Sequence, residues 1–346
     1  MSNSNSINIT RRAFMQASAA GGLALSAGAY AAAPAAREGM PYRVLGKTGE
    51  PVSLLCLGGF HIGRPEQTDQ ESIAIMRRAV DEGVNFFDNA WQYHEGRSEE
   101  RMGLALKDGY RDKVFLMTKH KGLDAATAQE HLETSLRRLQ VDMIDLWQFH
   151  ELVHPDQPRR IYENGAIDVA LKAKEQGKIR YIGFTGHHIN RTHLDMIERG
   201  FAWDTLQMPL NLFDYHFRSF QNNVLPVAAA KGMGVIAMKT LGGSPANFLE
   251  PGAVSAEECI RYAMDLPVST VCSGMDSMAL LETNLAIAKS FVPLTDEQRS
   301  ALREKVRPHA AKGMHEVYKT QWHRADIAIP DGEDPNPNLD TEAPVF

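Results

Sequence analysis

From Ser53 onward the chain alternates between short apolar runs and longer segments in which apolar residues recur at helical spacing. The short runs end on Gly or a polar residue and are apolar throughout, which is typical of parallel strands buried on both faces. Eight runs are therefore predicted to be strands: Leu54–Leu57, Asn85–Phe87, Val114–Thr118, Met143–Phe149, Ile179–Phe184, Thr205–Met208, Val235–Met238 and Ser269–Cys272.

The segments between these runs carry helix start and stop signals. Thr68 or Asp69 is expected to cap the first helix, Gly83 to end it, and Ser98 to cap the second. The predicted helices are Asp69–Glu82, Ser98–Leu106, Ala125–Leu139, Gly165–Gln176, Arg191–Arg199, Asn223–Ala230, Ala256–Met264 and Ser277–Ala288. Eight strand–helix units predict an α/β protein with a (β/α)8 TIM barrel.

The barrel is expected to be flanked by further elements on both sides. Ahead of it, two short β-type segments around Lys47-Thr48-Gly49-Glu50 predict an N-terminal β-hairpin that caps the barrel. After it, Thr295 is expected to cap a helix over Asp296–Val306, and the Pro- and Asp-rich stretch beyond Ile327 predicts an irregular C-terminal tail. The resulting organisation is a barrel over residues 41–310 and a tail over residues 311–346.

The first 36 residues carry the pattern of a twin-arginine signal peptide. Arg11-Arg12 precedes an Ala-, Gly- and Leu-rich run, Ala17–Ala33, that ends in Ala-x-Ala sites. That run is too short and too rich in Ala and Gly for stable membrane insertion. The leader predicts recognition by the twin-arginine export machinery and a periplasmic location.

The net charge and the cysteine spacing argue against some classes of function. The net charge of −6 leaves no basic excess for binding nucleic acid. The three cysteines, Cys56, Cys259 and Cys272, form no CxxC pair, so neither a zinc ribbon nor a disulfide framework is predicted.

Polar residues with acid–base chemistry gather at the expected carboxyl ends of strands two to four, where TIM barrels place their active sites. Asp88 ends strand two, Tyr93 lies in the loop after it, Lys119 ends strand three and His150 ends strand four. A lysine ammonium beside a tyrosine favours the phenolate, so we expect the pKa of Tyr93 to be lowered. The set contains no convincing nucleophile for hydrolysis, which favours electron supply by a cofactor.

Around these residues the motifs D-N-A-W-Q-Y, S-E-E-R-M-G, M-T-K-H, L-W-Q-F-H, G-F-T-G-H and I-A-M-K-T-L-G-G resemble the aldo-keto reductase family, over residues 41–290. The resemblance implies reduction of an aldehyde or ketone to an alcohol by a nicotinamide coenzyme, NADP or NAD. It also implies that Tyr93 is the general acid, that Lys119 lowers its pKa, that Asp88 pairs with Lys119, and that His150 positions the small-molecule carbonyl substrate.

The resemblance further implies that the coenzyme lies across the barrel mouth, with its carboxamide near Thr185, Gly186 and Gln207. The full implied set is Gly59, Phe60, Thr185, Gly186, Gln207, Met238, Lys239, Thr240, Leu241, Gly242, Ser273, Gly274, Met275 and Asn284. The chain departs from the family at three places. Thr185-Gly186 replaces a usual Ser-Asn, Met238 replaces a stacking aromatic residue, and no Lys or Arg lies between Ser273 and Asn284. The family therefore favours NADP, whereas the strand-eight residues do not.

Two other function classes stay open. Lys119 or Lys239 could form a Schiff base in a lyase on the same barrel. Alternatively, the protein could be a coenzyme-binding sensor with vestigial chemistry. Metal-dependent hydrolysis is disfavoured, and no metal site is predicted. Several histidines are expected at the mouth, but no HxH or HExxH pairing occurs; they are His61, His94, His120 and His187.

Overall fold

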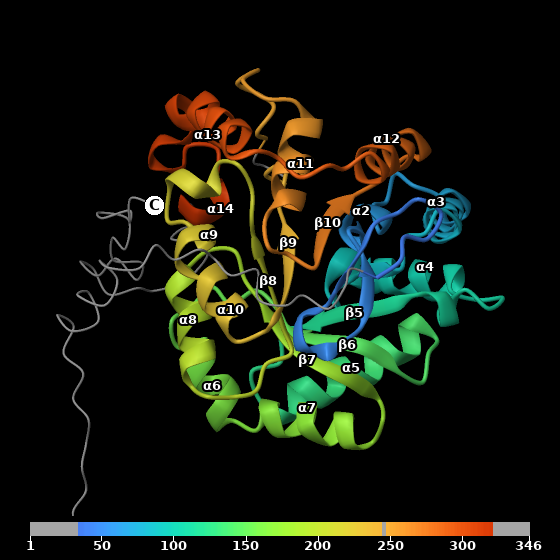
Figure 1. The fold of residues 1–346 in the computed structure, drawn as a ribbon. Coiled ribbons are helices and arrows are strands. Elements are labelled where there is room, and N and C mark those ends of the chain that lie inside the picture. Colours follow the sequence, from blue (N-terminus) through green and yellow to red (C-terminus); the bar gives the residue numbers. More distant parts are fainter. Residues whose placement is uncertain (1–33, 244–246, 321–346) are drawn as a thin grey trace, which may run out of the picture. The chain divides into compact units, whose positions relative to one another are not determined.

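Eight parallel strands close into a barrel surrounded by helices in the computed structural model, which describes residues 34–243 and 247–320 (Figure 1). The strand order is β10-β3-β4-β5-β6-β7-β8-β9. Their bounds are β3 Leu55–Gly58, β4 Phe86–Asp88, β5 Phe115–His120, β6 Ile144–Phe149, β7 Ile179–Thr185, β8 Thr205–Pro209, β9 Gly234–Met238 and β10 Thr270–Gly274. The predicted (β/α)8 barrel and all eight predicted strands are confirmed.

The α-helices that follow the strands also match the prediction closely. They are α3 Asp69–Asp81, α4 Arg97–Ala105, α5 Ala125–Leu139, α7 Ala166–Glu175, α8 Asn190–Glu198, α10 Leu225–Ala230, α11 Ala256–Asp265, α12 Met278–Lys289 and α13 Asp296–Ala310. Thr68 caps α3 in a capping box with Glu71. Four short helices were not predicted, because helices of one or two turns are too short to show a helical period in the sequence. They are α2 Gly59–Ile62, α6 Gln157–Glu163, α9 Phe220–Asn223 and α14 Val317–Thr320.

Ser98 is not the N-cap of α4, so that prediction is wrong. The helix begins one residue earlier, at Arg97, because Gly96 takes a left-handed conformation with φ 97° and turns the chain there. The Ser98 hydroxyl instead donates a hydrogen bond to the carbonyl oxygen of Gly59 at 2.6 Å. This bond fastens α4 to the carboxyl end of β3, beside the barrel mouth.

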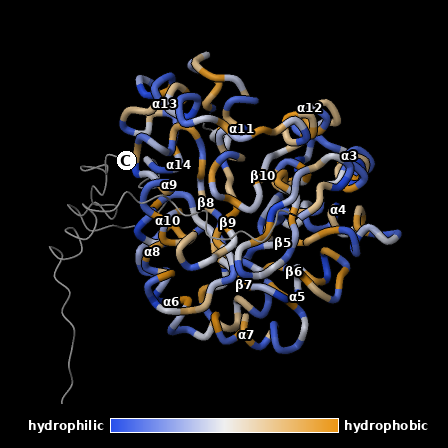
Figure 2. Tube along the Cα trace, viewed as in Figure 1, coloured by the Kyte–Doolittle hydropathy of each residue, from blue (hydrophilic) through white to orange (hydrophobic). Residues whose placement is uncertain are grey.

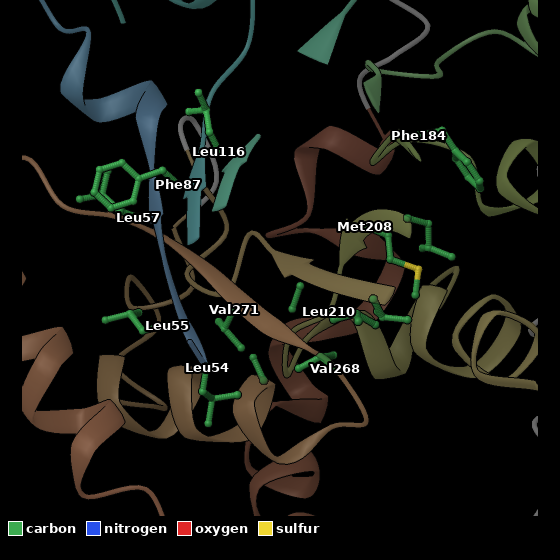
Figure 3. Close-up of a cluster of buried hydrophobic side chains, with 14 of the residues drawn as sticks. Leu54, Leu55, Leu57, Phe87, Leu116, Phe184, Met208, Leu210, Val268 and Val271 are labelled. Carbon is green, nitrogen blue, oxygen red and sulfur yellow. The ribbon is translucent and has the colours of Figure 1, made fainter. Parts of the chain in front are cut away.

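Two apolar layers stabilise the barrel. Strand side chains point alternately into the barrel and out toward the helices, and Figure 3 shows part of the outer layer, including Leu57, Phe87 and Leu116. The inner layer is small and consists of Leu45, Val52, Cys56, Phe86, Phe115, Met117, Leu146 and Ile236. Hydrophilic residues gather on peripheral helices such as α3 and α13 (Figure 2). Since both faces of each strand are buried, the strands show no hydropathy alternation.

The predicted hairpin closes the amino-terminal end of the barrel. It consists of β1 Tyr42–Val44 and β2 Pro51–Ser53, which pair antiparallel. Leu45 and Val52 belong to the inner apolar layer, and the Lys47 amide donates to the Gly232 carbonyl at 2.7 Å. The carboxyl ends of the strands are therefore the open end.

The first part of the region assigned to the tail, residues 311–320, packs against the barrel. The Lys319 ammonium is fully buried and contacts the Asp214 and Glu316 carboxylates at 2.6 and 2.8 Å. Residues 321–346, which include the Pro-rich part of the predicted tail, and residues 1–33, which make up most of the predicted signal peptide, lie outside the described residues. Among the residues that are described, no helix is long and apolar enough to cross a bilayer.

Candidate active site

The four predicted catalytic side chains come together at the open end of the barrel. Asp88 ends β4, Lys119 is the penultimate residue of β5, and His150 directly follows β6. Each lies an even number of residues after an inward-pointing residue of its strand, so its side chain also points inward. Tyr93 reaches them from the 3-10 helix η2 (Tyr93–Gly96) in the loop after β4.

His120 does not face the mouth, contrary to expectation. It follows Lys119 in the same strand, so its side chain points to the opposite side of the sheet. There its ring stacks on Trp147 in the helix-covered layer, with ring centroids 3.7 Å apart. His120 is therefore a buried packing residue.

Asp88 and Lys119 form a buried ion pair. The Lys119 ammonium donates to Asp88 Oδ1 and also to the carbonyl oxygen of Asn89 at 2.6 Å, and its side chain is only 1% exposed. Burial by itself lowers the pKa of Lys119, but the charge of Asp88, the charge that Tyr93 carries once its phenol ionises, and the hydrogen bond to Asp88 together raise it above its usual value. Lys119 is therefore a fixed cation at neutral pH.

The second oxygen of Asp88 is also engaged. Oδ2 accepts a hydrogen bond from Gln207 Nε2 at 2.7 Å and one from the Cys272 thiol at 3.1 Å. Asp88 therefore orients Lys119 and is not free to act as a base. The sequence predicted neither a zinc ribbon nor a disulfide framework for the cysteines, and it gave no indication that Cys272 contacts Asp88. Its inward direction follows from its register opposite Cys56, which lies in the inner layer.

Tyr93 lies next to the cation. Its phenol oxygen is 3.3 Å from Lys119 Nζ. Burial raises the pKa of Tyr93, and the opposing effect of the Lys119 charge is smaller, so the pKa lies above its usual value. The predicted lowering of the Tyr93 pKa is thus wrong. The phenol is fully protonated at neutral pH, which suits a proton donor.

His150 stands across the mouth from Tyr93, with ring centroids 5.8 Å apart. Burial, and then the positive charge of Lys119, lower the pKa of His150 well below its usual value, so the ring is neutral. Its Nδ1 lies 3.2 Å from Gln92 Oε1. Because Gln92 Nε2 donates to Glu151 Oε2, Gln92 Oε1 accepts from Nδ1–H of His150 in this arrangement. Donation from His150 Nε2 to a carbonyl oxygen would require the Gln92 amide to be turned, which would break its hydrogen bond to Glu151.

Hydrogen bonds and a ring contact hold the loop that carries Tyr93 in place. His94 and Glu95 take left-handed conformations with φ 50° and 59°. Arg138 of α5 donates to the Trp91 carbonyl at 2.9 Å and to the Glu95 carbonyl at 3.3 Å. The Phe60 ring meets Tyr93 edge-on, with centroids 5.3 Å apart. These contacts fix the position of the phenol.

The residues implied for coenzyme binding lie mainly at the carboxyl ends of β7 to β10, on one side of the mouth. Gln207 provides the clearest indication of a ligand: its Oε1 is buried and has no hydrogen-bond partner among the described residues, while its Nε2 is occupied by Asp88. A buried acceptor of this kind fits the amide N–H of a carboxamide. Thr185 is paired with Gln207 across β7 and β8. The residues at this edge therefore fit a nicotinamide ring.

The remaining members of that set have varied surroundings. Met275 is fully buried in the outer apolar layer, and Asn284 of α12 donates to the Ser273 hydroxyl at 3.1 Å. A side chain at Gly59 would overlap the Asp88 carbonyl, so this glycine permits close packing beside the site. Lys239, just after β9, has its Nζ 4.9 Å from the centre of the Tyr318 ring. Residues 240–242 continue the chain from Lys239, and Gly274 ends β10.

Residues 54–247 match the aldo/keto reductase family. The chain is 33% identical over 228 residues to the uncharacterized oxidoreductase YrpG of Bacillus subtilis, covering 59% of this chain and 67% of the relative. It is 36% identical over 203 residues to the aldo-keto reductase YhdN of Bacillus subtilis, covering 55% of this chain and 58% of the relative.

Solved structures show the same fold. An aldo/keto reductase from Klebsiella pneumoniae, in complex with NADP and acetate, superimposes with a TM-score of 0.62 at 21% identity, covering 76% of this chain and 95% of that one. The family match covers more than half of this chain, and it coincides with the part that carries Asp88, Tyr93, Lys119 and His150. The protein therefore belongs to the aldo/keto reductase family and is an NAD(P)H-dependent oxidoreductase.

Proposed function

We propose that the protein reduces an aldehyde or ketone to an alcohol, with Tyr93 as the general acid. The observation that carries the proposal is the contact chain from Asp88 through Lys119 to the Tyr93 phenol, opposite a neutral His150. When bound, the nicotinamide coenzyme supplies the hydride.

Proton transfer follows from the charges of the site. As negative charge develops on the carbonyl oxygen, the Tyr93 phenol donates its proton to that oxygen. The phenolate that remains lies 3.3 Å from the Lys119 ammonium, which stabilises it. His150 would orient the carbonyl oxygen from the other side. Asp88 keeps Lys119 in place, and a proton from solvent restores the phenol.

We infer that the preference for NADP or NAD depends on an ion pair that could not be predicted from the residues of the eighth strand. Arg64, which follows α2, forms an ion pair of 2.6 Å with Asp276 after β10. These two residues line a groove between α3 and the start of α12, together with Gln67 and Met278. Arg64 suits a 2′-phosphate, whereas Asp276 repels it. We therefore propose that the protein uses NADP or NAD with little discrimination.

The reduced coenzymes are expected to bind with dissociation constants within about tenfold of each other. Asp276→Asn should shift the preference toward NADPH because it removes the repelling carboxylate, and Arg64→Gln should shift it toward NADH. Side-by-side fluorescence titrations would measure this. Arg77→Gln, which breaks a surface ion pair elsewhere on α3, is the control. A preference that neither variant changes would place the 2′-phosphate away from this groove.

We also propose that residues 1–36 are a twin-arginine signal peptide and that the protein works in the periplasm. The support is the Arg11-Arg12 pair followed by the Ala-rich run. Bound coenzyme would stabilise the folded barrel by mass action, so we expect the protein to load its dinucleotide before export. The barrel domain would then comprise residues 41–310 and the tail residues 311–346.

Replacing both Arg11 and Arg12 with Lys should keep folded, active enzyme in the cytoplasm, because the twin-arginine pair is the recognition signal. Cell fractionation with activity staining would measure the distribution. The matched control is the same change at Arg77 and Arg78, an arginine pair within α3. Equal periplasmic levels of the leader variant and the wild type would refute the proposed export route.

A Schiff-base lyase remains a second candidate because of Lys239. Burial lowers the pKa of Lys239 to about 8, which makes its neutral amine more available than that of Lys119. Borohydride treatment in the presence of carbonyl compounds distinguishes the two functions. A covalent adduct on Lys239 that forms together with carbon–carbon bond cleavage would favour the lyase.

A further inference from the structure

A second group of reactive side chains lies beside His150, outside the Asp88–Lys119–Tyr93 chain. Glu151 directly follows His150, and His187 and His188 follow the end of β7. One ligand atom from each of these three residues lies within 4.8 Å of the other two. The mechanism proposed above uses none of the three, so the inference below does not rest on it.

The two oxygens of Glu151 differ. Oε2 contacts the Lys121 ammonium at 2.5 Å and accepts a hydrogen bond from Gln92 Nε2 at 3.2 Å. Oε1 faces His187 Nε2 at 4.0 Å, which is beyond hydrogen-bond range. The negative charge at Oε2 is thus balanced by Lys121. Oε1 faces the histidines and has a lone pair available for a metal ion.

His188 is the most unusual member. Both its Nδ1 and its Nε2 are buried and make no hydrogen bond of good geometry within residues 34–243 and 247–320, although the backbone of Tyr318 lies close to the ring. Its ring packs against that of His187, with centroids 4.1 Å apart. Buried polar atoms in native proteins nearly always have a partner, and where the protein supplies none, a water molecule or an ion is expected.

We propose that Glu151 Oε1, His187 and His188 bind one divalent transition-metal ion at the barrel mouth. Two imidazoles and one carboxylate match the ligands of zinc and related ions, whereas calcium and magnesium prefer oxygen alone. Bond lengths of about 2.0–2.2 Å require the three ligand atoms to draw together by small side-chain rotations. The remaining coordination position would be open to water or to an oxygen of a small molecule.

Two nearby cations moderate the affinity. Lys121 already pairs with Glu151, and the charge of Lys239 acts on both histidines. The site should therefore bind zinc more weakly than a closed structural site with four protein ligands. Gln92 links the site to the proposed active centre, because it contacts both Glu151 Oε2 and His150 Nδ1.

Zinc itself is the probe. The full chain, prepared without a polyhistidine tag and freed of metal by a chelator, is titrated with zinc against a chromogenic indicator. We expect one zinc ion per chain at this site, and cobalt substitution should give the visible absorption of an ion with nitrogen ligands. His188→Asn and Glu151→Gln should each weaken binding at least tenfold, since even losing a group that supports a ligand typically costs about 10–100-fold.

Two further variants sharpen the test. His309→Asn, on α13 and away from the site, should leave zinc affinity unchanged. Lys121→Met should tighten binding, because it removes the cation paired with Glu151. Zinc should also raise the Tm of the wild type but not that of the Glu151→Gln protein. If His188→Asn does not fold, the Glu151→Gln variant still tests the site. Absence of stoichiometric binding, or equal loss in His188→Asn and His309→Asn, would overturn the proposal.

Discussion

The Tyr93→Phe variant is expected to lose about 10²–10⁴-fold in kcat/KM for aldehyde reduction, the usual loss when a positioned general acid is removed. Coenzyme affinity should stay nearly unchanged, because the phenol acts on the substrate oxygen. The substitution keeps the ring, and with it the edge-on contact with Phe60, so the loop should keep its position. Steady-state kinetics on a panel of aldehydes and a coenzyme titration measure the two effects separately.

The matched control for this substitution is Tyr110→Phe. The Tyr110 hydroxyl lies on the surface, 3.3 Å from the Asp81 carboxylate, and its loss should leave kcat/KM at the wild-type value. Near wild-type reduction of good aldehydes by the Tyr93→Phe protein would show that another group donates the proton.

Lys119→Met is expected to impair both catalysis and folding. Catalysis suffers because the phenolate formed at Tyr93 loses the cation 3.3 Å away. Stability suffers because Asp88 is left as a buried carboxylate without its cation, a change that typically costs about 3–5 kcal/mol. Kinetics together with chemical denaturation at neutral pH would show both losses.

The stability difference should also depend on pH. The pKa of Lys119 is raised in the folded protein, so its ion pair contributes fully below the pKa of an unfolded lysine. That contribution is lost as pH rises through the folded pKa. The wild type and Lys119→Met should therefore converge in stability at strongly alkaline pH. Lys113→Met is the control, because Lys113 lies over the Tyr110 ring at the surface. A constant difference at all pH values would contradict a charge-based role.

The element order of the fold was predictable because each buried strand is a short apolar run that ends at a Gly or a polar residue. The directions of side chains were harder to predict. Strands covered on both faces show no alternation, so the sequence could not tell that Lys119 points inward and His120 outward. The pairing register supplies that information, and it also reveals Cys272 next to Asp88.

Long-range contacts account for the other differences. Ser98 had the residue type of an N-cap, but the loop ends earlier, at Gly96, and the Ser98 hydroxyl donates its hydrogen bond to the carbonyl oxygen of Gly59 instead. The pKa of Tyr93 was expected to follow its charged neighbour, yet burial has the larger effect. Burial depends on the packing of the whole loop, including Phe60, which spacing along the chain does not show.

Following the hydride tests the central claim most directly. The protein is incubated with an aldehyde and reduced coenzyme that carries deuterium at both positions of the reactive ring carbon, and the alcohol is analysed by mass spectrometry. We expect one deuterium atom on the former carbonyl carbon, formed rapidly by the wild type and very slowly by Tyr93→Phe. Alcohol without coenzyme deuterium, or tightly bound coenzyme that is not oxidised by any carbonyl compound of a broad panel, would contradict carbonyl reduction as the function.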